Sequence, residues 1–243
     1  MGIRERAAIG WLSVDRASRS ILTLNRKQEF KVLSQMLGFK PTDMVLDVGT
    51  GDGFWTARMA KHCASIVGVE PDRNLLGYAR AIHAGPNLRY VRATAENLPF
   101  EDSSFDKVIS VSCLEHFQDP EQGLRQMARV LKPGGRLAIS VDSLLPENSD
   151  SGFREWHKQR HYVTRYFRQD ELCKMIESAG LLCEPRRTVH IFRSRLAAWV
   201  RQVVTRRPKV WLPFFPLSYL AVRGADWQFN DMPGQIIIVA ATR

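Results

Sequence analysis

The chain has 243 residues, of which 44% are hydrophobic and 25% are charged. This composition is ordinary for a globular protein and excludes bulk disorder. No apolar run approaches the roughly 18 residues of a membrane-spanning helix, and the first residues lack the apolar stretch of a signal peptide, so we expect a cytoplasmic protein. The four cysteines have neither metal-ligand spacing nor the density of a disulfide scaffold, and we expect reduced thiols at Cys63, Cys113, Cys173 and Cys183.

The net charge of +10 is concentrated in one segment. Between Pro185 and Ala225 there are nine Arg or Lys residues and no Asp or Glu. A charge excess confined to one segment indicates an attachment surface rather than a general affinity for nucleic acid.

The first part of the chain alternates between predicted strands and helices. A helix is predicted over residues 18–37, because its apolar residues have helical spacing and Gly38 follows. Further on, the patterns predict strands at residues 44–48, 65–70, 88–92, 105–111 and 136–141, and helices at residues 54–62, 72–84 and 120–131. This alternation predicts an α/β fold with a mainly parallel sheet and helices on both faces. Ligands of such sheets bind at the carboxyl ends of the strands.

The pattern is looser after residue 141. Residues 142–166 are polar and irregular, residues 168–180 have the pattern of an amphipathic helix, and residues 181–192 and 235–242 can each form a strand. Residues 193–207 are predicted to be a helix that ends at Pro208. Its apolar stripe consists of Leu196, Trp199, Val200, Val203 and Val204, and its basic residues off the stripe are Arg195, Arg201 and Arg206. Residues 210–220 are aromatic and apolar and are interrupted by two prolines.

A glycine-rich loop, Asp47-Val48-Gly49-Thr50-Gly51-Asp52-Gly53, follows the first predicted strand and opens a helix. Glycine permits positive φ, and the free N–H groups at the start of a helix can bind an anionic group. The next strand ends in Glu70, nineteen residues after Gly51, where a carboxylate can accept both hydroxyls of a ribose. The dinucleotide pattern G-x-G-x-x-G fails because residue 54 is Phe, and no Walker loop is present.

This D-x-G-x-G-x-G loop resembles the first motif of class I S-adenosylmethionine-dependent methyltransferases. Further matches follow in order over residues 44–141: the strand end at 68–72, the stretch 93–100, the strand 105–110 with Leu114-Glu115-His116, and the turn 131–137. Within the family, the segment is similar to small-molecule and lipid methyltransferases of type 11. The resemblance implies a Rossmann-like, seven-stranded, mainly parallel sheet whose last strand is antiparallel, with S-adenosylmethionine as the cofactor.

The resemblance also implies which residues bind the cofactor: Asp47, Gly49, Thr50, Gly51, Gly53, Glu70, Pro71, Thr94, Ala95, Glu96 and Ser112. Glu70 is expected on the ribose. Thr94 departs from the family, since many relatives have an acidic residue there that accepts from the adenine amino group. A threonine hydroxyl can also accept, but without a charge.

Three histidines are candidates for the base that removes a proton from the methyl acceptor. His116 follows the fourth predicted strand, where the methyl group should point, although it could instead cap a helix or pack beside the cofactor. His157 and His161 lie in the polar stretch, which we interpret as a lid together with Trp156, Tyr162 and Tyr166. We expect no metal there, because the residues between the two histidines are basic and lack the Glu of H-E-x-x-H.

The basic segment has three interpretations. A basic amphipathic helix beside an aromatic stretch is typical of an element in the interface of an anionic membrane, here residues 193–222. The apolar stripe could instead pack on the domain as a structural cap. Nucleic acid is the least favoured partner, because no RNA-binding motif accompanies the basic residues.

The expected organisation is an N-terminal helical cap at residues 1–40 and a methyltransferase domain at 41–243, with a lid at 142–167 and a basic amphipathic insertion at 193–233. The expected function is methyl transfer to oxygen or carbon of a small or lipid-like acceptor, in the cytoplasm with peripheral membrane contact. The alternatives are an RNA methyltransferase and a protein that binds the cofactor without catalysis. The Asn/Asp-Pro-Pro motif of amino-nitrogen methylation is absent, and Ser112-Cys113-Leu114-Glu115 stands in its place.

Overall fold

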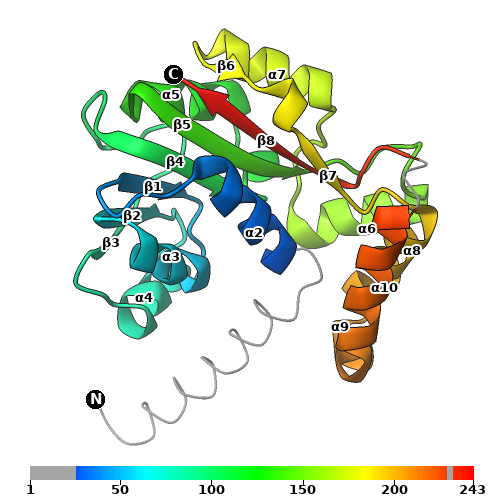
Figure 1. The fold of residues 1–243 in the computed structure, drawn as a ribbon. Coiled ribbons are helices and arrows are strands. Elements are labelled where there is room, and N and C mark those ends of the chain that lie inside the picture. Colours follow the sequence, from blue (N-terminus) through cyan, green and yellow to red (C-terminus); the bar gives the residue numbers. More distant parts are fainter. Residues whose placement is uncertain (1–25, 229–231) are drawn as a thin grey trace, which may run out of the picture.

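The structure, a computed structural model, describes residues 26–228 and 232–243 and has one mixed sheet at its centre (Figure 1). The strands are β1 (Met44–Val48), β2 (Ser65–Val69), β3 (Leu88–Val91), β4 (Phe105–Val111), β5 (Leu131–Asp142), β6 (Leu182–Cys183), β7 (Val189–Ile191) and β8 (Ile236–Thr242). Their order is β3-β2-β1-β4-β5-β8-β6, and β7 also pairs with β8. Strands β1 to β5 are mutually parallel, and β8 is antiparallel to β5. The predicted parallel sheet with an antiparallel last strand is confirmed.

The sheet differs from the expected seven strands at its outer edge. The strand predicted over residues 181–192 is divided into β6 and β7, both of which pair with β8. A 3₁₀ turn, η3 (Pro185–Arg187), separates them. Proline lacks the N–H that a ladder requires, so Pro185 interrupts a run whose composition otherwise favours a strand.

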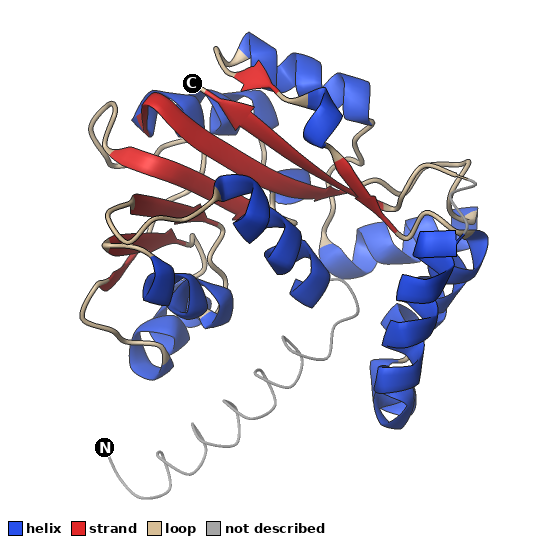
Figure 2. Ribbon diagram, in the orientation of Figure 1, coloured by secondary structure: helices blue, strands red, loops and turns tan. Residues whose placement is uncertain are grey.

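Helices cover both faces of the sheet (Figure 2). They are α2 (Arg26–Leu37), α3 (Phe54–Met59), α4 (Arg73–Ile82), α5 (Pro120–Val130), α6 (Ser151–His161), α7 (Gln169–Ser178), α8 (Arg195–Arg206), α9 (Pro208–Trp211) and α10 (Phe215–Gln228), with the 3₁₀ turns η1 (Ala60–His62), η2 (Leu114–His116) and η4 (Leu212–Phe214). Helices α5 and α7 bury their apolar residues against one face, whereas α2, α3 and the ends of α8 and α10 nearest the sheet pack on the other. Residues 18–25 of the first predicted helix lie outside the described residues.

Two helical segments were not expected. Residues 142–166 were predicted to be irregular, but they contain α6, whose N-cap Asp150 accepts a hydrogen bond from the Phe153 amide (2.7 Å). Only a few apolar side chains mark this helix, so its sequence periodicity is weak. The proline-interrupted stretch is helical as well. Pro208 begins α9 and Pro216 lies in the first turn of α10, positions at which a helix needs no proline N–H.

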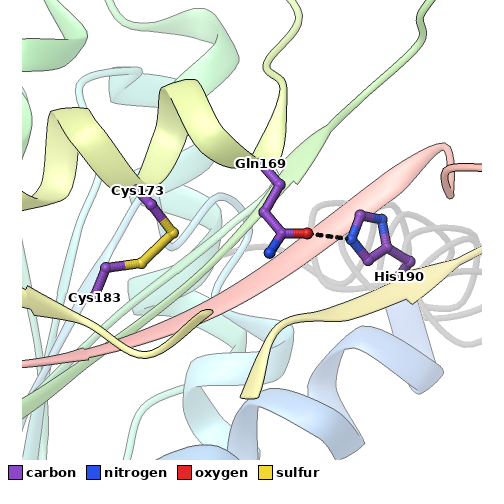
Figure 3. Close-up of a disulfide and its surroundings, with 4 residues drawn as sticks. All are labelled: Gln169, Cys173, Cys183 and His190. Carbon is purple, nitrogen blue, oxygen red and sulfur yellow. Dashed lines mark hydrogen bonds between the residues drawn. A yellow bond between two sulfur atoms is a disulfide. The ribbon is translucent and has the colours of Figure 1, made fainter. Parts of the chain in front are cut away.

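The expectation of four reduced thiols was wrong. Cys173 on α7 and Cys183 on β6 form a disulfide, with Cα atoms 5.6 Å apart (Figure 3). The sequence separates them by only ten residues, and the turn between α7 and β6 places the two side chains face to face. Cys63 and Cys113 are free. Beside the disulfide, Gln169 and His190 are joined by a hydrogen bond of 2.8 Å, which ties α7 to β7 (Figure 3).

Helices α8, α9 and α10 form an arm that projects from the edge of the domain (Figure 1). The near ends of α8 and α10 are held against the sheet by Ala197, Val222 and Ala225, which are buried among residues of β7 and β8. Within residues 26–228 and 232–243, no helix is both long and apolar enough to span a bilayer.

Candidate active site

The glycine loop lies at the carboxyl end of β1 and has a backbone that only glycine adopts readily. Gly49, Gly51 and Gly53 have φ values of +83°, +57° and +78°. Packing adds a second constraint, because a Cβ on Gly49 would overlap the Cys113 sulfur, and a Cβ on Gly53 would lie 2.9 Å from Ala79 Cβ. A Cβ on Gly51 would meet nothing within 4 Å. The loop is therefore packed against neighbouring side chains at Gly49 and Gly53, whereas the space beside Gly51 is open.

Asp47 lies beneath this loop rather than in it. Its side chain is buried and accepts a hydrogen bond from the Thr56 hydroxyl, which also contacts the Thr50 hydroxyl. Burial raises the pKa of Asp47 to about 6, although the bonds from Thr56 and Thr50 oppose the rise. Asp47 and Thr50 thus organise the loop from within.

Glu70 connects the end of β2 to the glycine loop. One carboxylate oxygen accepts from the Gly51 amide (3.0 Å) and the other from the Asp72 amide (3.0 Å). Burial raises the pKa of Glu70, while these two amides favour the charged form. Each oxygen keeps a further lone pair, so the carboxylate can accept hydroxyl donors from above the loop.

The remaining predicted cofactor residues surround this edge of the sheet. Pro71 and Thr94 are exposed, Ala95 is buried, and Thr94 follows the end of β3. The Glu96 carboxylate is already used within the protein, since it accepts from the Gln118 amide (3.0 Å) at the start of α5. Glu96 therefore positions that turn.

Ser112 is tied to a residue that the sequence did not indicate. Its hydroxyl and that of Ser140 each donate to one oxygen of Glu29, both at 2.7 Å. Glu29 comes from α2 and is fully buried, and its second oxygen has no hydrogen-bond partner among the described residues. The N-terminal helix thus places an incompletely paired carboxylate near the ends of β4 and β5. A glutamate on the apolar side of a predicted helix was the only sequence signal.

The chain is similar in sequence to known methyltransferases. A family model described as "Methyltransferase domain" matches residues 46–139. The chain is 33% identical over 156 residues to a biotin biosynthesis bifunctional protein of Cellvibrio japonicus, and 32% identical over 156 residues to a ubiquinone biosynthesis O-methyltransferase of Aeromonas salmonicida. These alignments cover 62% and 60% of this chain, but 30% and 66% of the relatives, so the chain spans only part of their length.

Residues 46–139 are a domain of the S-adenosylmethionine-dependent methyltransferase family. A crystal structure of a candidate methyltransferase from Bacillus halodurans C-125 has the same fold over 88% of this chain and 97% of its own, with a TM-score of 0.63 and 26% identity. The predicted family, its Rossmann-like fold and its cofactor, S-adenosylmethionine, are confirmed.

The glycine loop suits this cofactor in the methyltransferase domain. Space is open above Gly51, a buried carboxylate stands at the end of β2, and the unpaired oxygen of Glu29 matches a group that carries hydrogen-bond donors or a positive charge. S-adenosylmethionine carries ribose hydroxyls and an ammonium group, so these residues fit it chemically.

A second polar cluster lies at the carboxyl ends of β4 and β5, around Asp142. His157 Nε2 on α6 is 3.5 Å from Asp142 Oδ2, and His157 Nδ1 is 3.1 Å from the Tyr166 hydroxyl. Arg201 on α8 forms a buried ion pair with the same carboxylate. Burial by itself raises the pKa of Asp142, but Arg201 and His157 outweigh it and the pKa is lowered. Asp142 is therefore charged and ties α6 and the arm to the sheet.

The structure brings all three predicted base candidates into this region. Two of them, His116 and His161, are exposed, and His157 is buried. Both nitrogens of His157 face partners, and burial lowers the pKa of His157 to about 4, so its ring is neutral. The His161 ring lies 4.6 Å from that of His157, and desolvation lowers its pKa. His116 is exposed, and its Nδ1 is 3.4 Å from the Tyr162 carbonyl oxygen.

Glu115 completes the cluster as a buried acid. Its Oε1 accepts from the Asp142 amide (3.3 Å), and its Oε2 has no hydrogen-bond partner among the described residues. Burial and the charge of Asp142 raise the pKa of Glu115 to about 8, so it is protonated at neutral pH. Sequence reasoning missed Asp142, Glu115 and Arg201 as a group, because they are distant along the chain and meet only in the fold.

Proposed function

We propose that this chain transfers the methyl group of S-adenosylmethionine to oxygen or carbon of a small, lipid-like acceptor. The observation that carries the proposal is the position of the glycine loop and Glu70 at the same edge of the sheet as the histidine cluster around Asp142. Bound S-adenosylmethionine supplies an electrophilic methyl group on a sulfonium. The chain contributes by holding the acceptor, excluding water and accepting a proton.

On the cofactor side, Glu70 accepts the ribose hydroxyls, and the loop amides of residues 49–53 line the adjoining space. Glu29, whose other oxygen lies 3.7 Å from the Arg26 guanidinium, accepts the ammonium group with the oxygen that has no hydrogen-bond partner among the described residues. Thr94 and Ala95 border the adenine. These assignments are supported by the open space above Gly51 and by the unpaired buried oxygen of Glu29.

On the acceptor side, His116 is the proton acceptor. With its proton on Nδ1, the ring donates to the Tyr162 carbonyl oxygen and leaves Nε2 as an acceptor. His161 is the second candidate, because it is exposed and its lowered pKa keeps it neutral at pH 7. His157 is a positioning residue: its contacts with Asp142 and Tyr166 fix the lid helix α6.

A lipid-like acceptor is supported by two observations. One relative is named for ubiquinone biosynthesis, and the arm presents apolar side chains at the surface of this chain.

The test combines cofactor titration with product analysis. Isothermal titration should show binding of S-adenosylhomocysteine, and Glu70→Ala should weaken it by about 10- to 100-fold, because a charged acceptor of hydrogen bonds is removed. Glu101→Ala, which changes an exposed acid remote from the loop, is the control. Mass spectrometry should then find label from methyl-labelled S-adenosylmethionine in a lipid extract. Label in RNA instead would favour the RNA methyltransferase, and binding without any labelled product would favour a non-catalytic role.

A further inference from the structure

The arm carries a concentration of exposed apolar side chains. Of the ten large hydrophobic side chains that are exposed in the described part of the chain, seven belong to it: Leu196, Trp199, Val210, Phe214, Leu217, Leu220 and Trp227. Single exposed apolar residues are normal on a protein surface, but a contiguous set marks an interaction surface. The other three, Met44, Tyr162 and Leu182, are distributed over the rest of the domain.

Three of them, Trp199, Phe214 and Leu217, line an apolar groove between α8 and the α9–α10 segment. The groove has a volume of about 260 Å³. It is lined by Trp199, Val200, Val203, Val204, Trp211, Phe214, Leu217, Ser218 and Ala221. Four residues of the predicted apolar stripe, Trp199, Val200, Val203 and Val204, therefore line this groove, and Val200 and Val204 also pack against the core of the domain. The buried residues of α8 are Ala197, Ala198 and Arg201.

The structure also shows which arginine side chains of the arm are exposed. The membrane interpretation grouped Arg201 with the basic residues of this helix, but Arg201 does not contribute to such a surface, because its side chain is buried against Asp142. Arg206, Arg207 and Arg223 are exposed on the arm. No acid lies between residues 185 and 225, so the electrostatic field of the exposed arm is positive.

We propose that the arm docks on an anionic lipid surface, with Trp199, Phe214, Leu217 and Leu220 entering the interfacial region and the exposed arginines beside the headgroups. An anionic bilayer complements both properties of the arm, because it offers apolar depth and negative charge at one surface. The arm projects from the domain (Figure 1), so its apolar face can reach a flat surface. This inference deepens the proposed function by naming the partner of the arm. It rests on the proposed function only in that the membrane would supply the lipid-like acceptor.

Vesicle co-sedimentation of the full chain tests the docking, without cofactor or acceptor present. The protein should bind vesicles of phosphatidylcholine with phosphatidylglycerol more tightly than vesicles of phosphatidylcholine alone. Leu217→Glu should weaken binding by about tenfold or more, because an inserted apolar side chain becomes charged. Leu182→Glu is a matched control, since Leu182 and Leu217 are both 68% exposed and only Leu217 lies on the arm.

The basic residues are tested in the same assay. Arg207→Gln/Arg223→Gln should reduce binding to anionic vesicles by roughly tenfold or more at low salt, and the difference from the unmodified chain should shrink at 1 M salt. Lys61→Gln/Arg89→Gln removes two exposed charges from the opposite region of the domain and should have little effect.

Two results would overturn the docking proposal: equal losses in the arm variants and their controls, or no binding to anionic vesicles. In the second case, gel filtration tests for a dimer that Leu217→Glu disperses. Such a dimer would assign the groove to a second copy of the chain. Cofactor titration in vesicle-free buffer reports on the methyltransferase site alone, so the two proposals fail separately.

Discussion

Arg201 and Asp142 form a buried ion pair between the arm and the end of β5, although 59 residues separate them in the chain. Arg201 also donates to the Gln235 carbonyl oxygen (3.1 Å), which adds the start of β8 to the contact. Because Asp142 faces His157 as well, one carboxylate joins the sheet, α6 and the arm. The same ion pair therefore contributes both to the orientation of the arm and to the arrangement of the histidine cluster.

Arg201→Met should destabilise the protein by about 3–5 kcal/mol, because Asp142 is left as a buried charge without its main partner. Urea denaturation measures this. Arg206→Met is the comparison: Arg206 is 41% exposed, lies 3.7 Å from Asp150, and should cost below about 1 kcal/mol. Equal losses of unfolding free energy in the two variants would show that the buried Arg201 ion pair stabilises the protein no more than the exposed Arg206 pair. In Arg201→Met/Asp142→Asn the loss should be partly recovered.

Gly51→Ala should remove cofactor binding at a modest cost in stability. Gly51 and Gly38 share a φ of +57° and have no atom within 4 Å of an added Cβ, but Gly38 follows α2 and is remote from the loop. Both substitutions should cost about 1–2 kcal/mol through backbone strain. Isothermal titration with S-adenosylhomocysteine should separate them, with affinity lost only in Gly51→Ala. Unchanged affinity in that variant would place the cofactor elsewhere.

The buried His157 should make the protein less stable in acid. Its pKa is about 4 in the folded protein and 6.5 as the reference value, so between these pH values the unfolded chain binds a proton that the folded chain does not. Stability from this group is therefore complete above about pH 6.5 and falls as the pH approaches 4, by roughly 2–3 kcal/mol.

Urea unfolding at several pH values from 7.5 to 4.5 measures this loss. His157→Gln should flatten the pH dependence in that window, whereas His62→Gln, which changes an exposed histidine, should leave the slope unaltered. Parallel curves for the original chain and His157→Gln would contradict the assignment. Glu115 has the opposite effect on the free energy of unfolding, because its raised pKa stabilises the folded form as the pH falls from about 8. The contribution of His157 is therefore measured as the difference between the original chain and His157→Gln.

His116→Gln should lower turnover by about 10²–10⁴ without changing the affinity for S-adenosylhomocysteine, if proton removal limits the reaction. The measurement is incorporation of labelled methyl groups into the lipid extract as a function of pH. His62→Gln is again the matched control. Retained activity in His116→Gln with loss in His161→Gln would transfer the role to His161.

The placement of the glycine loop at the end of β1 could be predicted from the sequence because its parts are local. The glycine loop, the preceding strand and the helix that follows are consecutive, and their spacing requires positive φ at fixed positions. Glu70 follows from the same logic, since adjacent parallel strands end at one edge. The mostly parallel sheet could be predicted for the same reason.

The histidine cluster could be predicted only in part. The histidines were identified as candidates, but their division into one buried and two exposed rings depends on α6, which has a weak periodicity, and on Asp142 beneath it. The disulfide was missed because the composition of the whole chain says nothing about two thiols on facing elements.

The sequence by itself determined the order of strands and helices as far as residue 141, the glycine loop and the basic, apolar character of the arm, because each of these is encoded by neighbouring residues. Only the tertiary structure decided that Arg201 faces inward to Asp142 while Trp199 and Leu217 remain at the surface. The reason is physical: burial and pairing of a charge depend on partners brought together from distant parts of the chain, and a helical pattern alone does not show which side of α8 the domain covers.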